Sequence, residues 1–175
     1  DHGETKCLRL RDPRRFGVVT WTEKDPFTHK LLKHLGPEPL SENLSADFLW
    51  KKSKGRKTPV KSFLMNGRVV VGIGNIYASE ALFRASIHPR RSAGKISRER
   101  YVRLVGHIRA VLREAIACGG TTLKDFVKND GEPGYFKQNL LVYGKSGHPC
   151  PKCNSDIKSE IIGQRSSFYC ARCQR

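Results

Sequence analysis

Two pairs of cysteines near the end of the sequence constrain its fold more than any other feature. Cys150 and Cys153 are separated by two residues, as are Cys170 and Cys173, and sixteen residues lie between the pairs. This C-x2-C-x16-C-x2-C spacing is typical of a tetrahedral zinc site in which two tight turns each supply two thiolates. Four cysteines leave no open coordination position, so we expect one structural Zn²⁺ that folds this part of the chain.

The sixteen residues between the cysteine pairs predict a β-hairpin. Residues 157–162 and 166–169 read as two short strands around Gly163, Gln164 and Arg165. An arginine at such a tip can bind a phosphate with its planar fork of donors. From these residues alone, a solvated arginine is an equally good interpretation.

The composition points to a polyanionic partner. Lysine and arginine total 33 against 16 acidic residues, for a formal net charge of +17 and a sequence pI near 10.0. Charge of this size is typical of proteins that bind nucleic acid. The sequence shows no membrane-spanning apolar run, signal peptide or lipidation motif, so we expect no membrane association and a cytoplasmic location. Cys7 and Cys118 are predicted to be reduced thiols, with a Cys7–Cys118 disulfide as the alternative.

Hydrophobic periodicity and capping residues divide the chain into a strand-rich start, a helical middle and the zinc hairpin. Residues 6–11 and 17–22 alternate like strands. Because the first residues resemble the middle of a hairpin and no initiator Met is present, we expect a fragment. The helices expected from apolar spacing and caps cover residues 27–35, 46–52, 59–65, 76–85, 97–117 and 122–127.

Two stretches of the helical middle are candidate phosphate sites. Residues 72–75 place Gly-Ile-Gly-Asn at a helix start, where Asn75 is a suitable N-cap and free backbone N–H groups attract anions. Lys54, Arg56, Lys57 and Lys61 cluster within residues 53–61 and could neutralise phosphates. The simpler interpretations are a cap without a ligand and a solvated basic loop.

A third candidate lies in the turn of residues 12–17, which contains Arg14, Arg15 and Phe16. An exposed aromatic side chain beside arginines could wedge into a base stack while the guanidinium groups bind the opened duplex. Alternatively, Phe16 faces a hydrophobic core.

Taken together and in this order, these motifs resemble the bacterial formamidopyrimidine-DNA glycosylase family. The resemblance is carried by residues 12–17, 35–40, 71–80, 119–126, 130–136 and 142–144, together with the zinc cysteines. It implies an α+β fold: a remnant of an N-terminal β-sandwich over residues 1–24, an interdomain segment at 25–44, a helix-two-turn-helix DNA-binding domain at 45–140, and a zinc finger at 141–175.

The resemblance also implies an activity and a set of site residues. The expected activity is base-excision repair, in which a DNA glycosylase and AP lyase removes 8-oxoguanine and formamidopyrimidines from double-stranded DNA. The expected partner is DNA containing oxidised bases, bound by a monomer associated with the bacterial nucleoid. The expected catalytic residue is Arg165, which grips the phosphates at the lesion and serves the late elimination step. The expected DNA contacts are Arg14, Arg15, Phe16, Lys57, Lys61, Asn75 and Tyr135.

The sequence departs from the family at the nucleophile. The family uses an N-terminal proline amine followed by a glutamate, and an amine is essential to its Schiff-base chemistry. Because the chain begins with Asp1, we expect it to bind damaged DNA without excising bases. The alternatives are the oxidised-pyrimidine branch of the family and a non-catalytic zinc module that binds nucleic acid.

Overall fold

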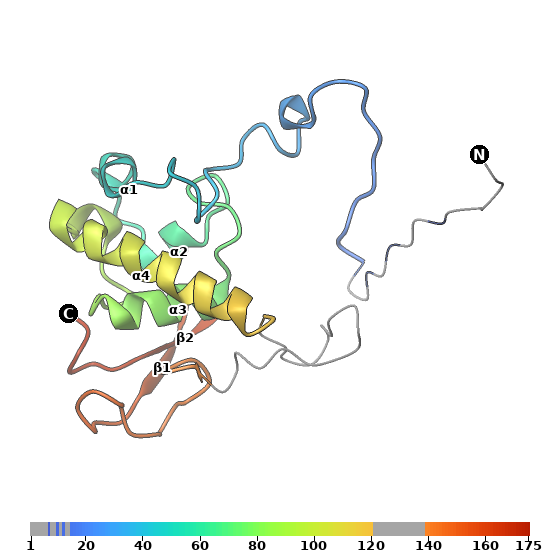
Figure 1. The fold of residues 1–175 in the computed structure, drawn as a ribbon. Helices are drawn as coiled ribbons and strands as arrows, with labels where there is room; N and C mark the ends of the chain where they lie inside the picture. Colours follow the sequence, from blue (N-terminus) through green and yellow to red (C-terminus); the bar gives the residue numbers. More distant parts are fainter. Residues whose placement is uncertain (1–6, 8–9, 11, 13–14, 121–138) are drawn as a thin grey trace.

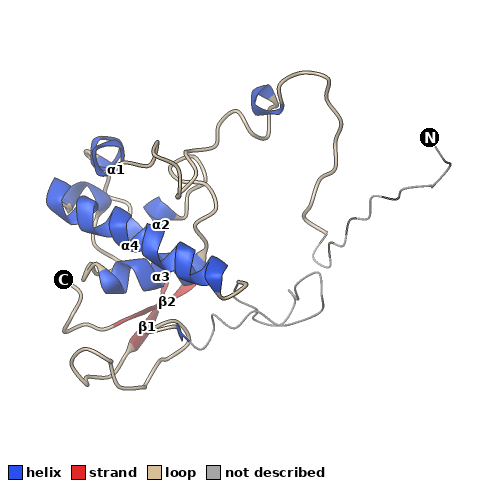
Figure 2. Ribbon diagram, viewed as in Figure 1, coloured by secondary structure: helices blue, strands red, loops and turns tan. Residues whose placement is uncertain are grey.

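The structure is a computed structural model that describes residues 7, 10, 12, 15–120 and 139–175 (Figure 1). Helices surround a common core and a two-stranded antiparallel sheet lies beneath them, so the predicted α+β class is confirmed (Figure 2). The elements are η1 (Pro26–Thr28), α1 (Ala46–Ser53), α2 (Val60–Leu64), α3 (Asn75–Arg84), η2 (Ala93–Lys95), α4 (Arg98–Ala117), β1 (Lys158–Ile162) and β2 (Arg165–Tyr169).

Serine caps begin two of the helices, and the one before residue 46 agrees with the predicted helix start. The Ser45 hydroxyl accepts a hydrogen bond from the Phe48 amide at 3.0 Å, and Ser97 caps α4 in the same way through the Arg100 amide. Each cap satisfies an amide that the first turn leaves without a helical partner, which is worth about 1 kcal/mol.

The start of α3 differs from the prediction. Gly74 is the N-cap, and Asn75 is the first residue inside the helix. The Asn75 side chain therefore does not cap its own helix, and its amide donates to the zinc hairpin instead. Asn75 already lies inside the helix, one residue beyond the position from which a side chain could cap it.

The helical core lies between α1, α3 and α4, with α4 packed against both of the others. Leu49, Leu82, Tyr101 and Leu104 are fully buried there, and burial of each large apolar side chain contributes about 2 kcal/mol. The Tyr101 hydroxyl donates to the Ala93 carbonyl at 3.0 Å, so this polar group is satisfied inside the core. The result is a rigid scaffold on which the hairpin rests.

The N-terminal part departs most from expectation. The predicted strand at 17–22 is wrong, because residues 15–25 carry no strand, and Val18 and Trp21 are largely exposed. The predicted helix at 27–35 is reduced to the short 3₁₀ turn η1. A strand requires a hydrogen-bonded neighbour and a buried face, and this segment extends away from the helical body (Figure 1). The predicted strand at 6–11 lies mostly outside the described residues, as does the helix at 122–127.

The zinc hairpin forms as predicted. Strands β1 and β2 pair antiparallel, with Lys158 opposite Tyr169 and Ile162 opposite Arg165. Gly163 and Gln164 both have positive φ, at 56° and 61°, which is the backbone of a two-residue type I′ turn. Arg165 is therefore the first residue of β2 and does not lie within the turn.

The other two cysteines, Cys7 and Cys118, are free thiols, in agreement with the sequence prediction. Over the described ranges, none of the helices combines the length and apolarity needed to cross a bilayer.

Candidate nucleic-acid interface and its zinc site

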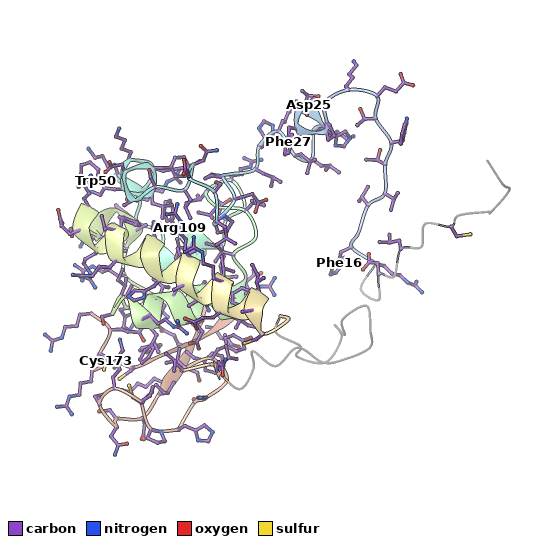
Figure 3. All side chains as sticks on the ribbon, in the orientation of Figure 1. Phe16, Asp25, Phe27, Trp50, Arg109 and Cys173 are labelled. Carbon is purple, nitrogen blue, oxygen red and sulfur yellow. The ribbon has the colours of Figure 1, made fainter. Side chains whose placement is uncertain are left out.

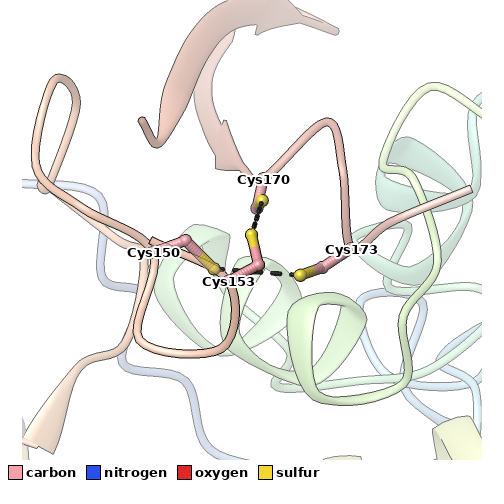
Figure 4. A group of neighbouring side chains, drawn as sticks. All are labelled: Cys150, Cys153, Cys170 and Cys173. Atoms are coloured by element: carbon pink, nitrogen blue, oxygen red, sulfur yellow. Dashed lines mark hydrogen bonds between the residues drawn. The ribbon is translucent and has the colours of Figure 1, made fainter. Parts of the chain in front are cut away.

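The two C-x2-C turns bring four sulfur atoms together at one point (Figure 4). The four Sγ atoms lie within 4.8 Å of one another, with 3.9 Å between Cys150 and Cys173 and 3.5 Å between Cys153 and Cys170. Zn–S bonds of about 2.3 Å place the sulfurs of a tetrahedral site about 3.8 Å apart, so the cluster fits one Zn²⁺. With all four positions taken by thiolates, this is a structural site.

The pKa values of the cysteine thiols are shifted in different directions by their surroundings. Burial raises the pKa of Cys170 and Cys173, whereas backbone and side-chain hydrogen bonds with Ser155 lower the pKa of Cys153. Zinc binding requires all four as thiolates, so loading the site displaces protons from the buried thiols.

Gln174 connects the zinc knuckle to the helical domain. Its side-chain oxygen accepts from the Cys170 amide at 2.9 Å, and its amide nitrogen donates to the Ile87 carbonyl at 2.8 Å. Gln174 is only 2% exposed, so both bonds lie inside the interface. One side chain therefore connects the zinc turn to the segment that follows α3.

The tip of the hairpin rests on α2 and α3. The Lys61 ammonium donates to the Ser166 carbonyl at 2.9 Å and to the Ser167 hydroxyl at 2.7 Å. The Asn75 amide nitrogen donates to the same Ser166 carbonyl at 3.0 Å. Two side chains predicted to bind DNA thus hold the backbone next to Arg165.

The close approach of the hairpin turn to α2 explains why residue 163 is a glycine. A Cβ at Gly163 would lie 2.6 Å from the Ser62 hydroxyl of α2, and the positive φ disfavours any other residue there. Beside this contact lies a hollow of about 270 Å³ lined by Ser62, Met65, Asn66, Ile162, Gly163 and Arg165. The exposed Arg165 side chain stands at its edge.

A buried carboxylate, Glu80 of α3, anchors the segment that enters the zinc module. Its two oxygens accept from the backbone amides of Leu141, Val142 and Tyr143, each at 2.9 Å. Tyr143 also accepts a 3.4 Å hydrogen bond from Asn75 through its hydroxyl, and its ring packs against Phe168. Glu80 and Tyr143 are not among the site residues predicted from the sequence, although a carboxylate among the apolar residues of α3 is a usable signal.

The predicted site residues divide into two groups in space. Lys61, Asn75 and Arg165 converge at the junction of α2, α3 and β2. Phe16 lies on the extended N-terminal segment, apart from that junction (Figure 3), and Arg15 directly precedes it in the chain. Phe16 is 82% exposed, so the alternative in which it faces a core is wrong here. Arg14 and Tyr135 lie outside the described residues.

Exposed positive charge in the segment before α2 and at the start of β2 favours an anion. Lys57 and Arg165 are exposed, and the described ion pairs join Arg84 to Glu114, Arg90 to Glu160 and Arg98 to Asp47. Lys61, in contrast, is fully buried, so a direct contact between its ammonium and DNA would require the hairpin to move. Exposed cations beside a helix start form a surface on which a phosphate backbone can rest.

These features define a class of protein, namely a helical domain joined by buried hydrogen bonds to a four-cysteine zinc hairpin. Residues 35–127 match the family described as the formamidopyrimidine-DNA glycosylase H2TH domain, and residues 147–175 match the zinc finger found in FPG and IleRS. The helix-two-turn-helix match covers more than half of the chain. The chain therefore belongs to the formamidopyrimidine-DNA glycosylase family, and its zinc finger is of the type found in that family.

Individual relatives agree with this assignment. The chain is 57% identical over 170 residues to the formamidopyrimidine-DNA glycosylase of Syntrophotalea carbinolica, covering 97% of this chain and 63% of the relative. It superimposes on the MutM (Fpg) protein of Thermus thermophilus with a TM-score of 0.85 and 40% identity, covering 93% of this chain and 62% of that one. The chain thus spans less than two thirds of the length of these relatives.

A third likeness is to Lactococcus lactis Fpg in complex with DNA containing an abasic site, with a TM-score of 0.76 and 30% identity. The match covers 83% of this chain and 53% of that one.

Proposed function

We propose that this chain binds damaged duplex DNA through the face formed by the hairpin tip, the start of α3 and the basic loop after α1. The observation that carries the proposal is the convergence of Lys61 and Asn75 on the backbone beside the exposed Arg165. The Lactococcus lactis relatives in complexes with abasic-site DNA and Fapy-dG DNA support the choice of partner. Arg14, Arg15, Phe16, Lys57 and Tyr135 are proposed as further DNA contacts.

The substrate class follows from the family. We propose that the whole family protein is a monomeric glycosylase and AP lyase that excises 8-oxoguanine and formamidopyrimidines, with Arg165 binding the phosphates at the lesion during strand cleavage. This chain on its own is proposed to bind the lesion without excising it, because that chemistry requires an amine nucleophile. Through its DNA partner, the protein would be found at the nucleoid.

A binding experiment tests the proposal. The zinc-loaded chain is titrated with a duplex containing a tetrahydrofuran abasic analogue and with the same duplex undamaged, at several salt concentrations. We expect tighter binding to the damaged duplex and an affinity that falls with salt as phosphate contacts release counterions. Equal affinity for both duplexes would support the non-catalytic zinc module instead.

A second experiment addresses catalysis. The chain is incubated with an 8-oxoguanine duplex, with and without borohydride, which traps a protein–DNA imine. Neither nicking nor an adduct is expected from this chain, whereas the whole family protein should give both. Turnover by the chain at enzyme-like rates would overturn the proposed division between binding and excision. Preference of the whole protein for thymine glycol over 8-oxoguanine would favour the oxidised-pyrimidine branch.

A further inference from the structure

Lys61 is a buried cation whose ammonium donates its described hydrogen bonds to the zinc hairpin. Its residue is 0% exposed, and its ammonium donates to the Ser166 carbonyl and the Ser167 hydroxyl. Burial lowers the pKa of this ammonium to about 8, so it is still mainly protonated at neutral pH. Hydrogen bonds from a charged donor are roughly twice as strong as neutral ones, so these contacts fix the hairpin firmly.

The contacts continue to the backbone of Arg165. Ser167 is itself fully buried, and its hydroxyl donates to the Arg165 carbonyl at 3.2 Å. The buried Lys61 ammonium thus binds the Ser166 carbonyl directly and the Arg165 carbonyl through the Ser167 hydroxyl. The Arg165 side chain remains exposed at the end of this arrangement.

We propose that Lys61 is a positioning residue: it fixes the backbone of residues 165–167 so that the Arg165 guanidinium is held ready for a DNA phosphate. In this role Lys61 acts through Arg165 and does not itself contact DNA. The inference rests on the proposed function, since it assigns the means by which that DNA-binding face is assembled.

A double-mutant cycle separates positioning from direct contact. Affinity for the tetrahydrofuran duplex is measured for the wild type, Lys61→Met, Arg165→Ala and the double variant. Lys61→Met should weaken binding by about tenfold in the wild-type background, because strong charge-assisted hydrogen bonds are lost. In the Arg165→Ala background the same change should weaken binding less than about twofold. Full additivity would show that Lys61 contacts DNA independently and would overturn the proposal.

Lys52→Met is the matched control. Lys52 also donates to a backbone carbonyl, that of Arg68 at 2.7 Å, so the variant loses the same charge and the same kind of bond outside the hairpin. Its effect on affinity should be the same with and without Arg165. Coupling of Lys52 to Arg165 as large as that of Lys61 would show only a general charge effect and would count against the proposal.

Ser167→Ala provides a second test of the positioning role if Lys61→Met fails to fold. This variant retains the ammonium but removes the hydroxyl that joins it to the Arg165 carbonyl. Reduced affinity that is non-additive with Arg165→Ala supports positioning, and unchanged or additive affinity overturns it.

Amide hydrogen exchange distinguishes failure of this inference from failure of the proposed function. In the absence of DNA, Lys61→Met should accelerate exchange across residues 165–167 while that of α4 is unchanged. Faster exchange in a chain without lesion preference would reject the proposed function and keep the structural part of the inference. Unchanged exchange would reject the inference itself.

Discussion

At the scale of single residues, the turn that presents Arg165 carries a strained backbone. Gln164 has a φ of 61°, in the left-handed region that costs a residue with a Cβ about 1–2 kcal/mol. Its partner in the turn is Gly163, for which the same region carries no such cost. The strain is therefore concentrated at one residue, immediately before the candidate phosphate ligand.

Replacing Gln164 by glycine should therefore stabilise the chain. We expect a gain of about 0.5–1 kcal/mol, because relief of the left-handed strain exceeds the entropy that glycine adds to the unfolded state. The free energy of unfolding is measured by urea titration. Gln164→Ala is the control, since it keeps the strained φ, and equal stability of the glycine and alanine variants would contradict the prediction.

Lys61 should also make the free energy of unfolding depend on pH. Burial lowers the pKa of its ammonium from 10.5 to about 8 in the folded protein. Between these values the unfolded chain binds more protons than the folded one, so stability contributed by Lys61 rises as pH increases from about 8 toward 10.5. Below about pH 8 the penalty for the buried charge is fully present.

The measurement compares wild type with Lys61→Met, so that groups common to both proteins cancel. The unfolding free energy of the wild type should rise relative to that of the variant above pH 8, by at most about 1.4 kcal/mol per pH unit. A difference that stays constant from pH 7 to pH 10 would show that the pKa of Lys61 is not lowered.

At the scale of elements, the helices and the hairpin are joined by buried polar side chains. Glu80 binds three consecutive backbone amides at 141–143, Gln174 connects the zinc knuckle to Ile87, and Lys61 binds the start of β2. Each of these side chains satisfies polar groups that would otherwise be buried without a partner. The free-energy cost of an unpaired buried group exceeds the net stabilisation that one hydrogen bond provides. The relative placement of α3 and the hairpin thus depends on a few side chains.

Glu80→Gln tests this connection. A glutamine directs an NH₂ group at a backbone amide that needs an acceptor, so we expect a loss of about 2 kcal/mol in unfolding free energy. Glu114→Gln is the control, because Glu114 forms an ion pair with Arg84 and its side chain is 44% exposed, and its loss should cost less than about 1 kcal/mol. Equal costs for the two variants would mean that Glu80 does not hold the segment at 141–143.

At the scale of the whole molecule, one zinc site supports the hairpin that carries Arg165. The short hairpin buries few large side chains of its own, among them Ile157 and Ile162. Two strands alone are marginally stable in water, so metal binding supplies folding energy. The helical core has its own cluster of fully buried residues, so we expect it to stay folded without the metal.

Cys150→Ser should therefore unfold the hairpin but leave the helices folded. We expect loss of bound zinc, which metal analysis measures. We also expect fast amide exchange over residues 158–169 and retained protection in α4, which hydrogen-exchange spectroscopy measures. Lowering the pH should release zinc from the wild type, since protons compete for the thiolates. Cys118→Ser is the control and should keep its zinc. Full zinc content in Cys150→Ser would contradict the four-cysteine site.

How much could be predicted depends on how far apart the interacting residues lie in the chain. The zinc ligands, the cap at Ser45 and the β1–β2 hairpin follow from spacings within one turn or one hairpin. The strand expected at 17–22 failed because alternation describes a preference, whereas a strand also needs a partner. The N-cap expected at Asn75 was wrong because the cap position falls one residue earlier, on Gly74, which leaves the Asn75 amide to donate to a carbonyl 91 residues away.

The amino-acid sequence by itself thus determined the metal, the elements that carry it and the family. Only the tertiary structure decided what the buried polar residues do. Lys61 lies in a basic stretch that reads as a solvated phosphate-binding cluster, yet its ammonium is buried against residues 105 and 106 positions away. Burial arises from packing between distant segments, and a local pattern contains no information on which polar group will be enclosed. The cysteine spacing predicted a hairpin, and the packing against α2 and α3 placed Arg165.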